Sequence, residues 1–165
     1  MEAPGDPARS GGRVPQPRDP QRKKARRKMR VFFDSSSLAK RYIKERGSEK
    51  VEEALAVAAE AAVSLVAPAE IISALSRLRR QGVLSAPQYD RAKTALYEDL
   101  EELSIREVTA PVVSLAIELL ERHVLRTLDA LHIAGAAEWR ADLFVSSDRR
   151  QLAAAAAAGL DVLQV

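Results

Sequence analysis

The sequence predicts an α/β fold, a three-layer α/β/α sandwich with a central parallel sheet. The first observation is a set of short, mostly apolar segments, at residues 30–33 (RVFF), 63–66 (VSLV) and 143–146 (LFVS). Apolar runs of this length are typical of strands buried on both faces. The second observation is that longer amphipathic segments separate them. Because parallel strands need crossover connections, these segments predict helices covering both faces of the sheet.

The first half of the chain alternates in this way from Met29 onward. After the strand at 30–33, helices are expected at 36–45 and 48–60, with a break at Gly47 and Ser48 as N-cap. The strand at 63–66 is followed by a helix that Pro68 opens and that ends near Gly82. Its apolar positions recur at helical spacing: Ile71, Ile72, Leu75 and Leu78.

The second half continues the alternation. A helix is expected from Ser85 to Leu103, then a short strand at 105–108 and a helix that begins at Pro111. Another helix runs from Thr127, interpreted as its cap, to about Trp139. The strand at 143–146 leads into a helix at 148–158, and residues 161–165 form a last strand.

Composition excludes several classes of protein. The 165 residues predict one domain, and with no cysteine there is neither a disulfide nor a thiolate metal site. No apolar run approaches the ~20 residues that a membrane helix needs. We therefore expect a cytoplasmic protein without a membrane partner.

The net charge of +3 is unevenly distributed. Residues 1–28 hold nine Lys or Arg against three acidic residues, a net +6, whereas the remaining 17 basic and 20 acidic residues give −3. Residues 1–28 also lack hydrophobic periodicity, so they are interpreted as a basic disordered tail, or as a start site placed too early with Met29 as the true beginning. Residues 29–165 are the predicted domain.

Three acidic residues follow predicted strands. Asp34 comes directly after the first, Glu70 four residues after the second, and Asp148 two residues after LFVS. Each alone suits a helix N-terminus. Because ligands bind outside the carboxyl ends of parallel strands, we expect the three to converge there. Clustered carboxylates repel one another, and Mg²⁺ or Mn²⁺ compensates that repulsion with the oxygen ligands such ions favour.

Asp129 follows no strand, and spacing alone sends it to no site. It is a first-turn acid behind Thr127. His132 lies one turn further on and is interpreted as a core histidine rather than a ligand.

Four segments together resemble PIN-domain ribonucleases, and most closely the VapC-type toxins of type II toxin–antitoxin pairs. They are FFDSSSLAKRY, APAEIISALSRLRRQG, LRTLDALHIAGA and FVSSDRRQLAAAAAAGL, in the order of that family. The resemblance implies a metal-dependent endoribonuclease that leaves 5′-phosphate and 3′-hydroxyl ends. It also implies an acidic quartet, which matches Asp34, Glu70, Asp129 and Asp148 and binds Mg²⁺ or Mn²⁺. Ser36 and Ser146 match hydroxyl positions of the family, with threonine more usual at the second.

The resemblance further implies an RNA substrate, a small antitoxin as partner and a homodimer. An acidic site repels RNA, so basic residues are expected at its rim. The candidates are Lys40, Arg41, Arg126, Arg149 and Arg150.

Two other functions use the same kind of fold. One is a non-catalytic PIN-fold metal-binding or scaffold domain, because a fold does not establish a function. The other is a phosphoacceptor receiver domain, which is disfavoured because the first strand offers only Asp34 and no lysine follows the last acid, Asp148.

Overall fold

The computed structural model describes residues 29–165, and the predicted tail at 1–28 lies outside them. A five-stranded sheet lies at the centre, in the order β3-β2-β1-β4-β5, and every neighbouring pair is parallel. The strands are β1 (Arg30–Phe33), β2 (Glu60–Ser64), β3 (Ser104–Arg106), β4 (Leu143–Ser146) and β5 (Asp161–Gln164). The predicted parallel sheet is confirmed.

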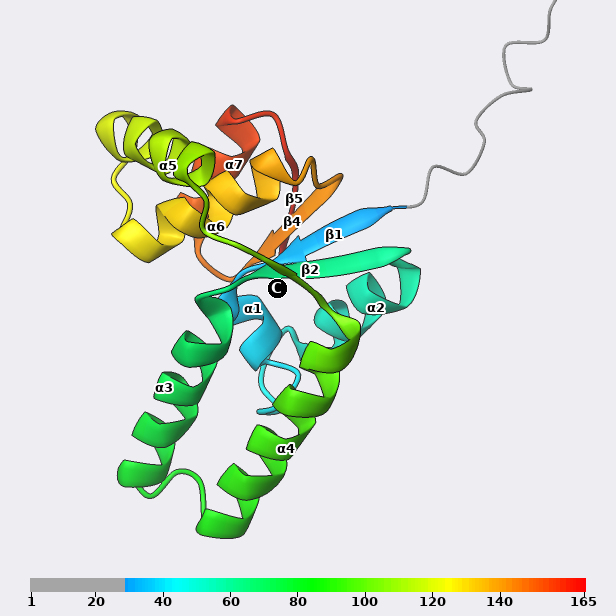
Figure 1. The fold of residues 1–165 in the computed structure, drawn as a ribbon. Helices are drawn as coiled ribbons and strands as arrows, with labels where there is room; N and C mark the ends of the chain where they lie inside the picture. Colours follow the sequence, from blue (N-terminus) through cyan, green and yellow to red (C-terminus); the bar gives the residue numbers. More distant parts are fainter. Residues whose placement is uncertain (1–28) are drawn as a thin grey trace, which may run out of the picture.

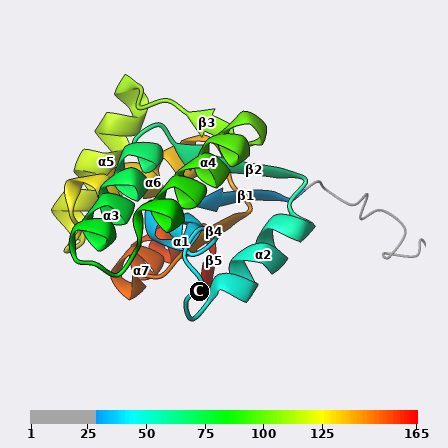
Figure 2. The same cartoon turned by 90° about the horizontal axis from the view of Figure 1, so that it is seen from below.

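Helices cover both faces of this sheet (Figures 1 and 2). The first four are α1 (Ser35–Ala39), α2 (Ser48–Val57), α3 (Ala67–Arg80) and α4 (Ala86–Glu102). The others are α5 (Ala110–Arg122), α6 (Thr127–Glu138) and α7 (Arg149–Ala157). Helices α1 to α4 share a core with Val31 and Phe33, whereas α5, α6 and α7 share a core with Phe32. Successive residues of β1 therefore face opposite layers, as the period of a strand requires, and the α/β/α sandwich is confirmed.

Several predicted boundaries were wrong. β2 starts at Glu60 rather than at residue 63, because the chain pairs with β1 from Arg30 onward and the amides of Ala59 and Glu60 donate to the Met29 carbonyl. α2 ends at Val57 for the same reason. β3 occupies 104–106 instead of 105–108.

Two predicted caps also differ. Gly47, not Ser48, precedes α2, with a φ of 98° that favours glycine, and an added Cβ would lie 2.5 Å from the carbonyl carbon of Val165. The Ser48 hydroxyl instead donates to the Lys40 carbonyl and accepts from the Glu45 amide. These bonds fix the turn that ends α1 before the predicted residue 45.

Helix α6 begins at Thr127, so Thr127 is its first residue rather than its cap. The helix start is stabilised by the Asp129 carboxylate, which accepts from the Arg126 amide at 3.1 Å. Within residues 29–165, no helix has both the length and the hydrophobicity to cross a bilayer.

Candidate active site at the carboxyl edge of the sheet

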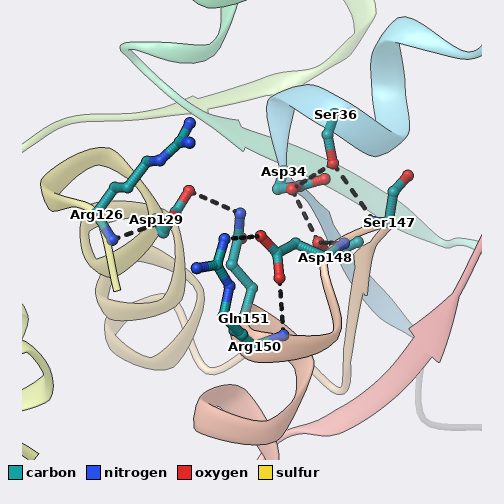
Figure 3. Close-up of polar contacts among 9 residues, drawn as sticks. Asp34, Ser36, Arg126, Asp129, Ser147, Asp148, Arg150 and Gln151 are labelled. Atoms are coloured by element: carbon teal, nitrogen blue, oxygen red, sulfur yellow. Dashed lines mark hydrogen bonds and ion pairs between the residues drawn. The ribbon is translucent and has the colours of Figure 1, made fainter. Parts of the chain in front are cut away.

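Asp34, Glu70 and Asp148 lie where the topology predicts, at the carboxyl edge of the sheet, and Asp129, which only the family resemblance assigned to the site, lies beside them. Asp34 caps α1 directly after β1, and Asp148 caps α7 two residues after β4. Glu70 lies in the first turn of α3, and Asp129 in the first turn of α6. Figure 3 shows Asp34, Asp129 and Asp148, which come from three separate segments, gathered at this edge, with the side chains of Arg150 and Gln151 between Asp129 and Asp148.

Asp34 is fully buried, and hydroxyl and amide groups hold its carboxylate. Oδ2 accepts from the hydroxyls of Ser36 at 2.7 Å and Ser146 at 2.9 Å, while Oδ1 accepts from the Ser37 amide at 2.7 Å. A carboxylate has about four acceptor positions, and these three bonds leave one on Oδ1. Asp34 is therefore rigidly oriented and retains one position for a ligand.

The two hydroxyls that hold Asp34 also contact the segment of Asp148. Ser146 Oγ accepts from the Asp148 amide at 3.0 Å, and Ser36 Oγ accepts from the Ser147 amide at 3.4 Å. Ser36 and Ser146, which match hydroxyl positions of the family, thus both hold the Asp34 carboxylate in one orientation.

Asp148 is paired with Arg150. Its Oδ1 accepts from the Arg150 amide at 2.8 Å, and Oδ2 lies 3.2 Å from Nη2 of the same residue (Figure 3). Partial burial raises the pKa of Asp148, but the hydrogen bonds from Arg150 outweigh it and lower that pKa below its ordinary value. Asp148 is thus held as a carboxylate ion.

Asp129 lies beside a buried amide that the sequence did not single out. Gln151, on α7, is 4 % exposed and donates from Nε2 to Asp129 Oδ1 at 2.9 Å (Figure 3). Its Oε1 is buried without a hydrogen-bond partner in residues 29–165. Gln151 links α7 to α6 and fixes the side chain of Asp129. The only signal for it in the sequence is its place one helical turn after Asp148.

Glu70 is held by a residue that the sequence analysis assigned to the core. His132 is 1 % exposed, and its Nε2 lies 2.6 Å from Oε2 of Glu70. His132 follows Asp129 by one turn of α6, so this contact brings Glu70 to the neighbourhood of Asp129. The interpretation as a buried histidine was correct, but the polar contact that accompanies burial was missed.

The acids do not form a closed metal cage. In the part of the chain that the structure describes, no three acidic or imidazole side chains lie close enough to hold one ion together. Each acid is instead held by a donor of the protein: hydroxyls at Asp34, Gln151 at Asp129, Arg150 at Asp148 and His132 at Glu70. Asp34, Asp129 and Asp148 nevertheless offer only oxygen ligands, the kind preferred by a hard cation that keeps several waters.

The five predicted RNA-binding residues fall into two groups. Lys40 is buried and donates to the Arg46 carbonyl at 2.7 Å, and Arg41 forms ion pairs with Asp99 and Glu52. These contacts favour structural roles for both residues. Arg126, Arg149 and Arg150 are exposed and flank the acids, and Figure 3 shows the Arg126 side chain beside Asp129.

The sequence of this chain matches one protein family and a relative within it. The profile of the PIN domain matches residues 31–157. The ribonuclease VapC47 of Mycobacterium tuberculosis is 31% identical over 128 residues, which cover 74% of this chain and 87% of the relative.

Solved structures share the fold at lower identity. VapBC2 of Rickettsia felis, bound to a DNA fragment from its promoter, has a TM-score of 0.61 and 16% identity over 83% of this chain and 99% of that one. VapC20 of Mycobacterium tuberculosis, a sarcin-ricin loop cleaving toxin, has a TM-score of 0.58 and 19% identity over 75% of this chain and 94% of that one. The family profile and the curated relative each span most of the chain, which therefore belongs to the PIN-domain family, with a VapC ribonuclease among its relatives.

Proposed function

We propose that this chain is a divalent-metal-dependent endoribonuclease that acts as the toxin of a toxin–antitoxin pair. The observation that carries the proposal is the gathering of Asp34, Asp129 and Asp148 at the carboxyl edge of the sheet. The chain's relation to VapC47, a ribonuclease, supports RNA as the substrate.

Asp34, Asp129 and Asp148 are the residues that would hold Mg²⁺ or Mn²⁺, with Glu70 binding through water or orienting the attacking water. An ion held there would supply two things, a lower pKa for a bound water and compensation for charge on the departing oxygen of the phosphodiester. Ser36 and Ser146 keep Asp34 in one orientation through the bonds described above.

The exposed cations beside the acids offset the repulsion between an acidic site and a polyanion. Arg126 and Arg149 are available to phosphates, because no ion pair to either is found in residues 29–165. Arg150 forms an ion pair with Asp148, and this pair must break before Arg150 can bind a phosphate.

The proposal includes a small antitoxin and a second copy of the chain as partners, acting in the cytoplasm. Its support is the fold shared with VapBC complexes, such as VapBC-1 of nontypeable Haemophilus influenzae, with a TM-score of 0.58 over 82% of this chain.

The test is cleavage of total RNA by the purified chain with Mg²⁺, with Mn²⁺ and with EDTA. Cutting should require the ion and should be lost in Asp34→Asn, while Glu101→Gln, an exposed acid on α4, should cut as the unmodified chain does. Folded protein that binds Mn²⁺ but cuts no RNA would support the non-catalytic scaffold instead.

A further inference from the structure

The hairpin of α3 and α4 carries a concentration of positive charge. Figure 1 shows the two helices extending side by side away from the sheet, joined at the far end. Residues 77–93 contain five of the 17 basic side chains of residues 29–165 but only one acid, Asp90. This segment has a net charge of +4, although residues 29–165 together carry −3. The five basic residues, called here the hairpin cations, are Arg77, Arg79, Arg80, Arg91 and Lys93.

No acidic side chain of the described residues forms an ion pair with any of the hairpin cations. Arg77, Arg80 and Arg91 are exposed, and none of them forms an ion pair with another described residue. Arg79 and Lys93 lie over aromatic rings instead, at 5.2 Å from the centroid of Tyr89 and 5.8 Å from that of Tyr97. Ring contacts of this kind orient a cation without cancelling its charge.

Helix stability accounts for only part of this charge. Arg77, Arg79 and Arg80 lie in the last turn of α3, where cations interact favourably with the helix dipole. Arg91 and Lys93 lie in the N-terminal half of α4, where the dipole offers no such benefit. The α4 residues therefore call for another explanation.

The hairpin cations continue a polar stripe that starts at the site. Glu70, Ser73 and Arg77 are spaced by three and four residues, so they share one side of α3. Seven residues of helix separate Glu70 from Arg77 by about 10 Å along the axis. A polymer seated at the carboxyl edge of the sheet can thus follow α3 to the hairpin cations.

We propose that the hairpin cations bind phosphates of the RNA outside the cleavage site, a proposal that rests on the proposed function. Guanidinium groups pair with phosphate through two parallel hydrogen bonds, which suits a surface of four arginines and one lysine. This contact adds affinity for long RNA without touching the bond that is cut.

The experiment measures RNA binding in the inert Asp34→Asn background, so that it does not depend on cleavage. A triple variant, Arg77→Gln/Arg80→Gln/Arg91→Gln, is compared with Lys44→Gln/Arg46→Gln/Arg122→Gln, which removes the same charge from exposed positions elsewhere. Fluorescence anisotropy with a labelled single-stranded RNA is read between 50 and 200 mM salt (~0.7 unit of slope per phosphate contact).

The hairpin variant should bind at least ~10-fold more weakly at low salt, and its log–log salt slope should flatten by about two. Equal affinity and slope in the two triple variants would overturn the proposal. So would unchanged RNA binding combined with weaker binding of an acidic peptide of matched charge, which would assign the surface to a protein partner.

Cleavage by the active chain is a separate arm of the experiment. The hairpin variant should raise KM for long RNA and leave kcat unchanged. If no form of the chain cuts RNA while the hairpin variant alone loses RNA binding, the nuclease proposal fails and the hairpin proposal stands.

Discussion

The imidazole Nε2 of His132 lies 2.6 Å from Oε2 of Glu70 and joins α6 to α3. An ionised carboxylate only accepts hydrogen bonds, so whenever Glu70 is ionised Nε2 is the donor in this contact. Nδ1 is buried without a partner in residues 29–165, so Glu70 is the one polar group there that fixes the ring.

Removing this donor should cost both stability and activity. His132→Leu should lower kcat/KM and Mn²⁺ affinity by about 10- to 100-fold, the usual effect of losing a group that orients a ligand. It should also lower the free energy of unfolding by roughly 1–3 kcal/mol. His132→Gln, which can still donate to Glu70, should recover part of the loss, and His123→Leu serves as the control. Mn²⁺ titration by calorimetry and urea denaturation give the two readouts.

A double-mutant cycle with Glu70→Gln separates a positioning role from simple packing. If His132 acts through Glu70, its removal should have little further effect on Mn²⁺ affinity once Glu70 is changed. Additive losses would show that His132 only packs.

The hydroxyl of Ser146 should matter more to stability than that of Ser36. Ser146 is fully buried, whereas Ser36 is exposed, so water can replace the Ser36 hydroxyl but not that of Ser146. Ser146→Ala should cost about 1–3 kcal/mol because Asp34 Oδ2 loses its buried hydroxyl donor, while Ser146→Thr retains that donor and should cost much less. Chemical denaturation checks the order, and equal costs for Ser36→Ala and Ser146→Ala would contradict it.

Sequence reasoning was most successful where one rule of topology was sufficient. The end of a parallel strand determines which edge a following residue occupies, so Asp34 and Asp148 could be placed from their positions alone. Asp129 follows a loop rather than a strand, and only the family resemblance connected it to the others. The partners of His132 and Gln151 could not be predicted, because periodicity shows that a side chain is buried but not which polar group it meets. Boundaries such as the start of β2 depend on pairing with β1, which is a non-local contact.

Arg150 competes with a cation for Asp148. Arg150→Gln should raise the pKa of Asp148 toward its ordinary value, because the hydrogen bond that lowers it is lost. A depressed pKa in the folded state adds stability above the ordinary pKa of about 3.9, and this is lost as the pH falls through the folded value. The variant should therefore lose that stability at a higher pH.

The same variant should bind Mn²⁺ up to about fivefold more tightly, the equivalent of a surface ion pair of about 1 kcal/mol. NMR titration of the Asp148 carboxyl carbon and Mn²⁺ calorimetry test both effects. Arg149→Gln, which loses an exposed and unpaired cation, should leave the pKa of Asp148 unchanged. An Asp148 titration that is the same in all three proteins would contradict the pairing.

The contacts of Arg41 predict a structural role that is separable from RNA binding. Arg41 Nε and Nη2 lie 2.6 and 3.1 Å from the two carboxylate oxygens of Asp99, and the Tyr42 hydroxyl donates to Oδ2 of Asp99 at 2.8 Å. These bonds tie the turn after α1 to α4. Asp99→Ala should therefore lower the free energy of unfolding by about 1–3 kcal/mol. Arg41→Gln should leave the salt slope of RNA binding unchanged, and a flatter slope would restore Arg41 as a phosphate contact.

Tyr42 gives this cluster a signature at alkaline pH. Burial and the hydrogen bond to Asp99 raise the pKa of Tyr42, so the folded state favours the neutral phenol. A raised pKa adds stability that is fully present below the unfolded value of about 10 and is lost as the pH rises toward the folded value. Urea denaturation at pH 7 and near pH 11 should show this loss in the unmodified chain and in Tyr97→Phe, but not in Tyr42→Phe. A loss of equal size in Tyr42→Phe would assign the alkaline transition to other groups.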